Sequence, residues 1–186
     1  MKRFVDVLLA ACAAFVLLLP IVAIALIVRL TSRGPALYWS DRVGRHNRIF
    51  RMPKFRTMLV GTPAVATHLL TDPSRHLTTI GGLLRRTSLD ELPQLWSILH
   101  GDMSIVGPRP ALYNQADLIA LRTEVGAHEL TPGLTGWAQI NGRDELDIPE
   151  KVKLDVEYLR RASLWFDIKI MVRTARQAFF GRGVSH

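Results

Sequence analysis

Hydrophobic residues are distributed unevenly along the chain, and the longest apolar run lies near its first residue. No charged residue occurs from Val7 to Val28, a run of 22 positions. At a rise of about 1.5 Å per residue, a helix of this length is close to what is needed to cross the hydrocarbon core of a bilayer. A cleaved signal peptide fits poorly, because the run is long and reaches Arg29 without a small-residue cleavage pattern. The pattern therefore predicts a membrane-associated helix.

Two features of this run leave its topology open. Pro20 divides it into about thirteen and about eight apolar residues, and each part is too short to span a bilayer. The positive-inside bias draws both ends toward the cytoplasm, because basic residues flank both: Lys2 and Arg3 before the run, and Arg29, Arg33, Arg42, Arg45 and Arg48 after it. A bend at the proline that returns the chain to the same face would satisfy both ends. From the residues alone, a re-entrant hairpin and a straight span are equally supported.

A second periodic segment begins with an acidic pair. Its apolar residues recur at the spacing of one helix face: Leu92, Leu95, Trp96 and Leu99. Pro93 is tolerated only in a first turn, which places the helix start near Asp90 or Glu91. Gly101 is typical of a residue just beyond a helix end, so the helix is expected to run to about His100.

The acidic pair has two interpretations. Taken alone, it is explained most simply as helix capping, because two boxes fit: Ser88 with Glu91, and Thr87 with Asp90. Its neighbours favour a different role, since Arg85 and Arg86 precede it and Arg109 follows between two prolines. Carboxylates and arginines around a helix N-terminus are typical of a site for phosphate and a divalent cation.

The other predicted elements are short. The patterns indicate a strand at 36–39, a basic β-hairpin within 41–58, a strand at 103–106 and helices at 111–122, 150–161 and 164–180. The last helix is basic and amphipathic, so it can lie on a membrane or pack on the domain. Residues 132–143 are rich in glycine, which allows the backbone to approach a ligand closely or to form a structural loop. The fold class is mixed α/β and mostly helical.

Composition limits the kinds of partner. The 186 residues carry a net charge of +8, of which only +1 lies in residues 1–28, so the basic surplus belongs to the rest of the chain. This surplus indicates an anionic partner. Nucleic acid is not expected, because aromatic residues are not interleaved with the basic runs as a stacking platform requires. A glycoside hydrolase is disfavoured, since its two carboxylates flank a bond about 5 Å or more apart. A non-catalytic membrane scaffold remains open if the pair is only a cap.

Several basic side chains are candidate ligands for phosphate or nucleotide: Arg85, Arg109, Arg143, Lys54 and Arg56. Arg109 is presented rigidly by its two prolines, which favours a functional role over a surface salt bridge. Arg143 fits either role equally. Arg56 could pair with a substrate phosphate or with an internal carboxylate, and the sequence does not choose between them.

Motifs in one order cover essentially the whole chain: Lys2-Arg3-x-x-Asp6, Gly34-Pro35, Arg42-Val43-Gly44, Lys54 to Met58, Thr87 to Pro93, Gly101 to Pro110, Pro132 to Arg143, Leu154-Asp155-x-x-Tyr158 and Asp167-x-Lys169. In this order they resemble the bacterial sugar transferases, and more narrowly the small monotopic phosphoglycosyl transferases.

The resemblance implies an activity. A sugar 1-phosphate would pass from a UDP-sugar to undecaprenyl phosphate with release of UMP, as the first membrane step of bacterial surface glycan or glycoprotein glycan assembly. It implies Mg²⁺ as cofactor and a two-step route through an aspartyl-phosphosugar. Carried over by motif position, Asp90 is the expected nucleophile, and Glu91 is its partner in organising metal and substrate. Both are expected metal ligands.

The resemblance also implies a topology. Residues 1–33 would form a re-entrant membrane hairpin bent at Pro20, and residues 34–186 a catalytic domain on the cytoplasmic face of the bacterial inner membrane, with interfacial helices at its C-terminal end. Membrane lipids are then partners, and a homodimer is one open possibility. One residue departs from the family pattern: Leu19 stands where a serine usually precedes the helix-breaking proline. The hydroxyl that could satisfy a freed carbonyl is missing.

Overall fold

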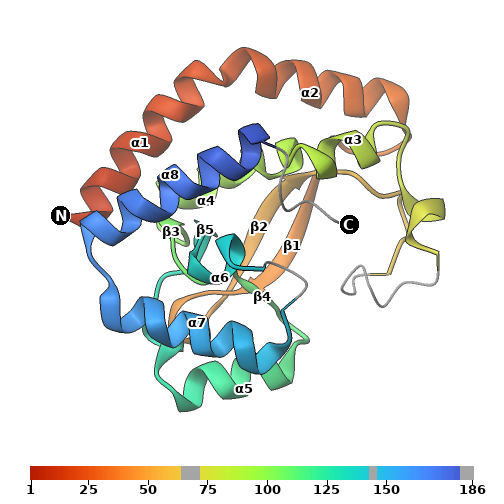
Figure 1. Ribbon diagram of the computed structural model, residues 1–186. Coiled ribbons are helices and arrows are strands. Elements are labelled where there is room, and N and C mark those ends of the chain that lie inside the picture. Colours follow the sequence, from red (N-terminus) through yellow and green to blue (C-terminus); the bar gives the residue numbers. More distant parts are fainter. Residues whose placement is uncertain (64–71, 143–145, 181–186) are drawn as a thin grey trace.

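The structure is a computed structural model that describes residues 1–63, 72–142 and 146–180 (Figure 1). Helices predominate and strands are short, so the expected mixed α/β fold is confirmed. The helices are α1 (Lys2–Val16), α2 (Leu18–Thr31), α3 (Gly81–Arg86), α4 (Leu95–His100), α5 (Ala116–Glu124), α6 (Trp137–Ile140), α7 (Ile148–Arg161) and α8 (Leu164–Phe180). The strands are β1 (Leu37–Val43), β2 (Ile49–Phe55), β3 (Ser104–Val106), β4 (Ala111–Leu112) and β5 (Gly133–Thr135). Short 3-10 helices are η1 (Arg45–Asn47), η3 (Pro73–His76), η4 (Leu89–Gln94) and η5 (Ala127–Glu129).

The predicted basic hairpin is confirmed as the antiparallel pair β1–β2. Its register runs from Leu37 opposite Phe55 to Val43 opposite Ile49. Two left-handed residues, His46 and Asn47, close its turn with φ of 55° and 58°. The segment expected as a helix over 111–122 instead begins with strand β4, which pairs with the other edge of β1, and α5 starts only at residue 116.

The second sheet is the parallel pair β3–β5, and it explains the glycines of the 132–143 segment. Ser104 lies opposite Gly133, and Val106 opposite Thr135. A Cβ on Gly133 would lie 2.1 Å from the amide nitrogen of Gly107, so no side chain fits between these two backbones. The close backbone approach is therefore made to β3 and the residue after it, which is the structural-loop interpretation of this glycine-rich segment.

The long apolar run forms an arch of two helices, α1 and α2, bent by 63° (Figure 1). The chain breaks at Leu17, so the bend lies about one turn ahead of Pro20, the residue that was expected to cause it. Pro20 lacks the N–H that would bond the carbonyl of Val16, and its ring crowds that carbonyl, so the disruption falls one turn earlier. The arms have 15 and 14 residues. No single helix in the described ranges is long and apolar enough to cross a membrane, whereas the bent pair meets that test by length and composition.

Polar contacts dock the first arm of the arch onto the domain. The Lys2 ammonium lies 2.6 Å from the Asp167 carboxylate. Arg3 donates to the carbonyl oxygens of Ile98 and Leu99 at the end of α4. Because these carbonyls lack partners within their own helix, the guanidinium satisfies acceptors that would otherwise be left over.

Asp6 makes the most buried of these contacts. Its side chain accepts hydrogen bonds from the Ile105 amide at 3.2 Å and from the Ser104 hydroxyl at 2.8 Å. The Ile105 amide lies on the edge of β3 that faces away from β5, so the carboxylate takes the place of a neighbouring strand. The second arm is seated by apolar contact, since Val28 belongs to a buried cluster with Phe55 and Leu84.

The segment around the acidic pair is helical as predicted, with two differences. Residues Leu89–Gln94, which include the pair, form the 3-10 helix η4, and α4 then ends at His100, just before Gly101, which has φ of 111° as expected for the stop. Trp96 was expected on the apolar face but is exposed, and Ile98 is fully buried there instead. The tighter 3-10 turns rotate the following residues away from ideal α-helical spacing.

We expect Asp6→Ala to destabilise the fold by about 1–3 kcal/mol, because the partly buried Ile105 amide would lose its acceptor and the Ser104 hydroxyl would keep only the Val106 carbonyl. Thermal unfolding of the protein in lipid nanodiscs measures this. Glu124→Ala, at an exposed carboxylate on α5, is the control and should change stability by less than about 0.5 kcal/mol. Equal stability of the two variants would show that Asp6 does not hold the arch on β3.

Candidate active site

Three segments that are distant in the sequence meet at the acidic pair. Asp90 and Glu91 lie on η4, Lys54 lies near the end of β2, and Arg109 lies on the loop after β3. β2 packs along η4, which places the Lys54 ammonium between the two carboxylates.

The turn before η4 sets the direction of the acidic pair. Ser88 adopts a left-handed conformation with φ of 56°, and its side chain makes no cap hydrogen bond. The helix-capping interpretation of Ser88 with Glu91 was therefore wrong. Only the backbone closes this turn, through the Glu91 amide and the Ser88 carbonyl at 3.2 Å. The two carboxylates are consequently not used as caps.

Helix α3 supplies the third cation of the site. A Cβ on Gly81 would lie 2.1 Å from the Thr57 carbonyl oxygen, so α3 can approach the end of β2 only because residue 81 is glycine. This approach lets the Arg85 Nε donate to the Thr57 hydroxyl at 3.1 Å. Burial lowers the pKa of the Arg85 guanidinium, and the negative charge of Asp90 opposes that shift.

The two carboxylates have unequal partners. One oxygen of Glu91, Oε1, accepts from Lys54 Nζ at 2.9 Å and from Arg109 Nη2 at 3.1 Å. The Asp90 carboxylate accepts no hydrogen bond from any residue that the structure describes, and Lys54 Nζ lies 3.9 Å from its Oδ2. Both side chains are largely buried, with 10% of Asp90 and 13% of Glu91 exposed.

This inequality separates the two pKa values. Burial opposes ionisation of Glu91, but Lys54 and Arg109 together outweigh burial and hold its pKa well below the usual range. Burial raises the pKa of Asp90, and the charge of Glu91 adds to that rise, while Lys54, Arg85 and Arg109 oppose it. Glu91 is thus a fixed anion within an ion-pair network, whereas Asp90 is a desolvated carboxylate with unused oxygens.

The donor set of the pair fits Mg²⁺. Magnesium in enzymes that act on phosphates is usually held by one or two carboxylates together with substrate oxygens and waters. Neither oxygen of Asp90 accepts a hydrogen bond from the described part of the chain, and Oε2 of Glu91 is outside the contacts with Lys54 and Arg109. No cluster of three or more His, Cys, Asp or Glu side chains occurs in the described ranges, so further ligands would come from substrate and water.

The remaining predicted ligands are placed differently. Arg56 is 5% exposed and lies away from the pair at the end of α2, where it donates to the carbonyls of Pro35 at 2.7 Å and Ser32 at 3.1 Å. Among the described residues, its hydrogen-bond partners are thus two backbone carbonyls just beyond α2 and not a carboxylate, while a role toward substrate phosphate stays a prediction. Arg143 lies outside the described residues.

Sequence reasoning did not single out Thr57 or Gln94. Thr57 orients Arg85, and its position within the Lys54 to Met58 motif was the available signal. Gln94 lies on the same short helix as Asp90 and is 2% exposed, and its amide nitrogen has no hydrogen-bond partner among the residues described. Its place one turn after the pair was the signal that could have identified it.

Comparison with known proteins gives the class of the chain. A family model described as bacterial sugar transferase matches residues 1–181, and the chain belongs to this family. Undecaprenyl-phosphate glucose phosphotransferase from Komagataeibacter xylinus is 45% identical over 86% of this chain and 32% of the relative. UDP-glucose:undecaprenyl-phosphate glucose-1-phosphate transferase from Escherichia coli is 40% identical over 98% of this chain and 41% of the relative. Uncharacterized sugar transferase EpsL from Bacillus subtilis is 40% identical over 99% of this chain and 90% of the relative.

The lengths of these relatives differ from that of the chain. It spans about a third of the Komagataeibacter protein and about two fifths of the Escherichia coli protein, but nearly all of EpsL. The acidic pair and its basic neighbours lie within the matched residues of the family model.

We expect Asp90 to titrate above its ordinary pKa of 3.8. Lys54→Met removes a cation that stabilises the anion, so the pKa of Asp90 should rise further, whereas Glu91→Gln removes a neighbouring anion and should lower it. Carbon-13 NMR of the labelled carboxyl carbon measures both shifts. Arg86→Met, at an exposed arginine nearby, is the control for loss of positive charge. A similar shift in this control would contradict a specific role for Lys54.

Proposed function

We propose that this chain is a phosphoglycosyl transferase that moves a sugar 1-phosphate from a UDP-sugar to undecaprenyl phosphate and releases UMP. Membership of the bacterial sugar transferase family supports the reaction class, and the name of the Escherichia coli relative specifies these substrates for that protein. The observation that carries the proposal is the division of roles between Glu91, which is held by two cations, and Asp90, whose oxygens are free of hydrogen bonds from the described residues.

The division of roles fits a covalent route. An oxygen of Asp90 attacks the phosphorus that carries the sugar, forming a carboxyl–phosphate bond while the pyrophosphate bond breaks and UMP departs with the electron pair. An oxygen of undecaprenyl phosphate then attacks the same phosphorus, and the Asp90 carboxylate leaves. Two easier steps replace one transfer, so the soluble donor and the lipid acceptor need not be bound together.

Cations around the pair address the main obstacle to this route. A carboxylate that approaches a diphosphate meets like charge, and two unit charges about 4 Å apart interact by roughly 4 kcal/mol at an effective dielectric of 20. Lys54 and Arg85 face Asp90, and Arg109 can donate to phosphate oxygens. Mg²⁺ held by Asp90 and Glu91 would supply further neutralisation of the phosphate charge. Glu91 fixes Lys54 and Arg109 so that both cations remain at the nucleophile.

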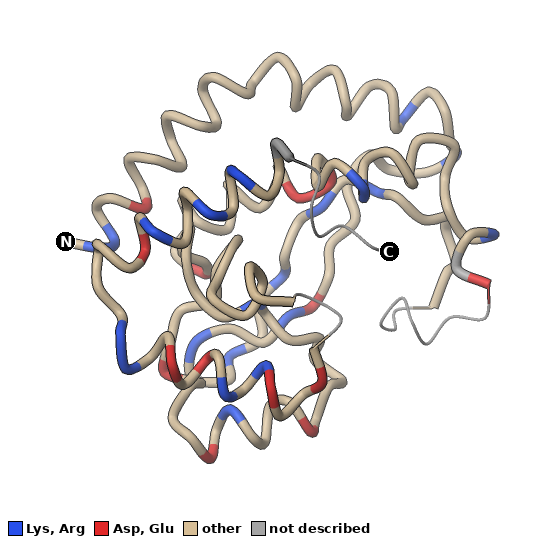
Figure 2. Tube along the Cα trace, viewed as in Figure 1, with Lys and Arg blue, Asp and Glu red and all other residues tan. Residues whose placement is uncertain are grey.

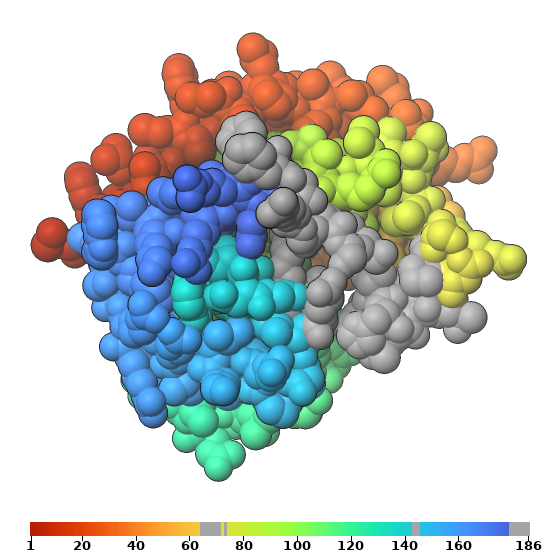
Figure 3. Space-filling model, in the orientation of Figure 1, coloured from red at the N-terminus to blue at the C-terminus, as the bar shows by residue number. Residues whose placement is uncertain are grey.

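The arch supplies a surface for the membrane. Figure 2 shows that it carries charge only near its two ends, and Figure 3 shows it as a continuous band along one edge of the molecule. Its exposed apolar side chains include Phe4, Leu8, Phe15, Val16, Leu18, Leu19, Val22, Leu26 and Leu30. On α8, Trp165, Ile168 and Val172 are also exposed. We propose that the arch is re-entrant, and that it holds the catalytic domain on the cytoplasmic face of the bacterial inner membrane at the level of the acceptor phosphate.

Asp90→Asn should reduce UMP release by on the order of 10³-fold or more, because the amide cannot act as the nucleophile. The assay uses undecaprenyl phosphate, Mg²⁺ and a panel of UDP-sugars that begins with UDP-glucose. Asp41→Asn, at an exposed carboxylate on β1, is the matched control and should retain normal release. Unchanged release by Asp90→Asn would overturn the role of Asp90 as nucleophile, whereas absence of release from the wild type with every UDP-sugar would favour a scaffold role.

The covalent step has its own measurement. Intact-protein mass after mixing wild-type enzyme with UDP-sugar and Mg²⁺, without acceptor, should show an adduct of one sugar phosphate, and Asp90→Asn should show none. Normal turnover without an adduct under single-turnover conditions would favour direct transfer between the two substrates.

The proposed re-entrant topology predicts that both ends of the arch face the same side. A cysteine ahead of Met1 and a second at Arg33, which is exposed beyond α2, serve as reporters after the native Cys12 is replaced by serine. Both should react with an impermeant maleimide only when inverted inner-membrane vesicles expose the cytoplasmic face. A cysteine at Glu124 reports the side of the domain, and labelling of the two arch ends from opposite sides would contradict the proposal.

A further inference from the structure

The loop that carries Arg109 is held through its carbonyl groups. Pro108 and Pro110 have no N–H, so the backbone on either side of Arg109 cannot donate hydrogen bonds. Instead, each of the three carbonyl oxygens accepts one. The Gly133 amide donates to Pro108 O at 2.9 Å, Arg122 Nη1 donates to Arg109 O at 2.9 Å, and Arg42 Nη1 donates to Pro110 O at 3.2 Å.

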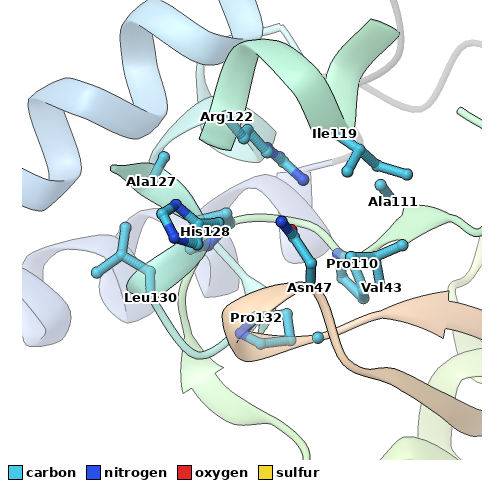
Figure 4. A pocket seen from close by; sticks show the side chains of 12 residues that line it. Val43, Asn47, Pro110, Ala111, Ile119, Arg122, Ala127, His128, Leu130 and Pro132 are labelled. Atoms are coloured by element: carbon cyan, nitrogen blue, oxygen red, sulfur yellow. The ribbon is translucent and has the colours of Figure 1, made fainter. Parts of the chain in front are cut away.

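Arg122 reaches this carbonyl from a buried ion pair. Its Nε and Nη2 lie 2.8 Å and 2.7 Å from one carboxylate oxygen of Asp155 on α7. Only 11% of the Arg122 side chain and 2% of the Asp155 side chain are exposed. Figure 4 shows Arg122 extending from α5 beside a small cavity. This cavity has a volume of about 30 Å³, and Pro108 and Pro110 also line it. The planar guanidinium is thus fixed on one side by Asp155 and directed at Arg109 O on the other.

A role limited to joining α5 with α7 would not require this arrangement. Burying two charges costs free energy that their attraction only roughly repays, so a buried ion pair is weak evidence for a stabilising role. Apolar side chains already join the two helices, since Leu118 of α5 and Val152 of α7 belong to one buried cluster. The third contact, from Nη1 to the Arg109 carbonyl, is the feature that packing does not explain.

We propose that Arg122, oriented by Asp155, is a positioning residue that fixes Arg109 against Glu91. The backbone oxygen that Arg122 holds and the guanidinium that reaches Glu91 at 3.1 Å belong to the same residue, between two rigid prolines. Fixing the carbonyl limits rotation of the peptide units on either side, and with it the direction of the Arg109 side chain. The inference rests on the proposed function, in which Arg109 binds substrate phosphate.

A double-mutant cycle tests this coupling. Lysine keeps the charge but lacks the planar fork, so Arg122→Lys cannot contact Asp155 and Arg109 O in the same geometry. We expect kcat/KM for the UDP-sugar to fall by about 10–100-fold, the range for residues that orient an active-site ligand. In an Arg109→Lys background, the same change should cost less than about twofold, because residues that act through one another are not additive. Melting temperature is measured for every variant.

The control is Arg45→Lys. Arg45 Nε also donates to a backbone carbonyl, that of Glu129 at 2.7 Å, but has no contact with the Arg109 loop. This variant should retain normal kcat/KM in both backgrounds. If Arg122→Lys does not fold, Asp155→Asn replaces it in the cycle, since the amide matches the carboxylate in size but lacks the charge that holds the Arg122 guanidinium, and the same criteria apply.

The outcomes separate the two hypotheses. In one outcome, the wild type releases UMP normally while the losses from Arg122→Lys and Arg109→Lys multiply in the double variant. This result would overturn the positioning role and leave the proposed function standing. Normal kcat/KM in Arg122→Lys would do the same. Absence of UMP release from the wild type with every UDP-sugar would overturn the proposed function, and the inference with it.

Discussion

The candidate site depends on how two adjacent, largely buried carboxylates share a few cations. At a separation of about 4 Å, two like unit charges repel each other by roughly 4 kcal/mol even at an effective dielectric of 20. Two adjacent carboxylates are therefore costly to bury unless cations offset this repulsion, and equal sharing of the cations would give the two carboxylates no difference in role. The fold resolves the conflict by giving Lys54 and Arg109 to Glu91. Asp90 is then left desolvated, near positive charge and without hydrogen bonds from the described residues, which suits the nucleophilic role proposed for it.

The same constraint explains why the site is assembled from distant segments. The short helix η4 carries no lysine or arginine of its own, so its two carboxylates depend on cations from other segments. The cations come instead from β2, from α3 and from the loop after β3. These elements are tied to the arch, since Asp6 bonds the edge of β3 and Val28 packs with Phe55 of β2 and Leu84 of α3. The helices of the arch and the ion-pair network therefore belong to one packed unit.

Local chemistry allowed much of this to be predicted from the sequence. The hairpin followed from alternation and an asparagine turn, and the end of α4 followed from Gly101, because these signals act over a few residues. The acidic pair and Arg109 were identified because charged residues are rarely concentrated around a helix start without a reason. The break at Leu17 was missed because a proline disturbs the carbonyl four residues earlier, and the exposure of Trp96 was missed because a 3-10 turn changes the helical phase. The partners of Arg56 and Arg122 could not be predicted, since they depend on contacts between segments 13 to 33 residues apart.

Prolines have opposite consequences in the two parts of the molecule. In the arch, Pro20 cannot donate the helical hydrogen bond that the Val16 carbonyl would accept, and the chain bends next to this carbonyl. Beside the acidic pair, Pro108 and Pro110 remove donors from a loop, and the remaining carbonyls are each bound from outside by Gly133, Arg122 and Arg42. Where no other group replaces the missing N–H of a proline, the chain bends. Where donors from other segments bind the carbonyls beside the prolines, the loop is held rigidly. A guanidinium that must meet both Glu91 and a phosphate needs the second arrangement, because freedom in its backbone would have to be lost again at each binding event.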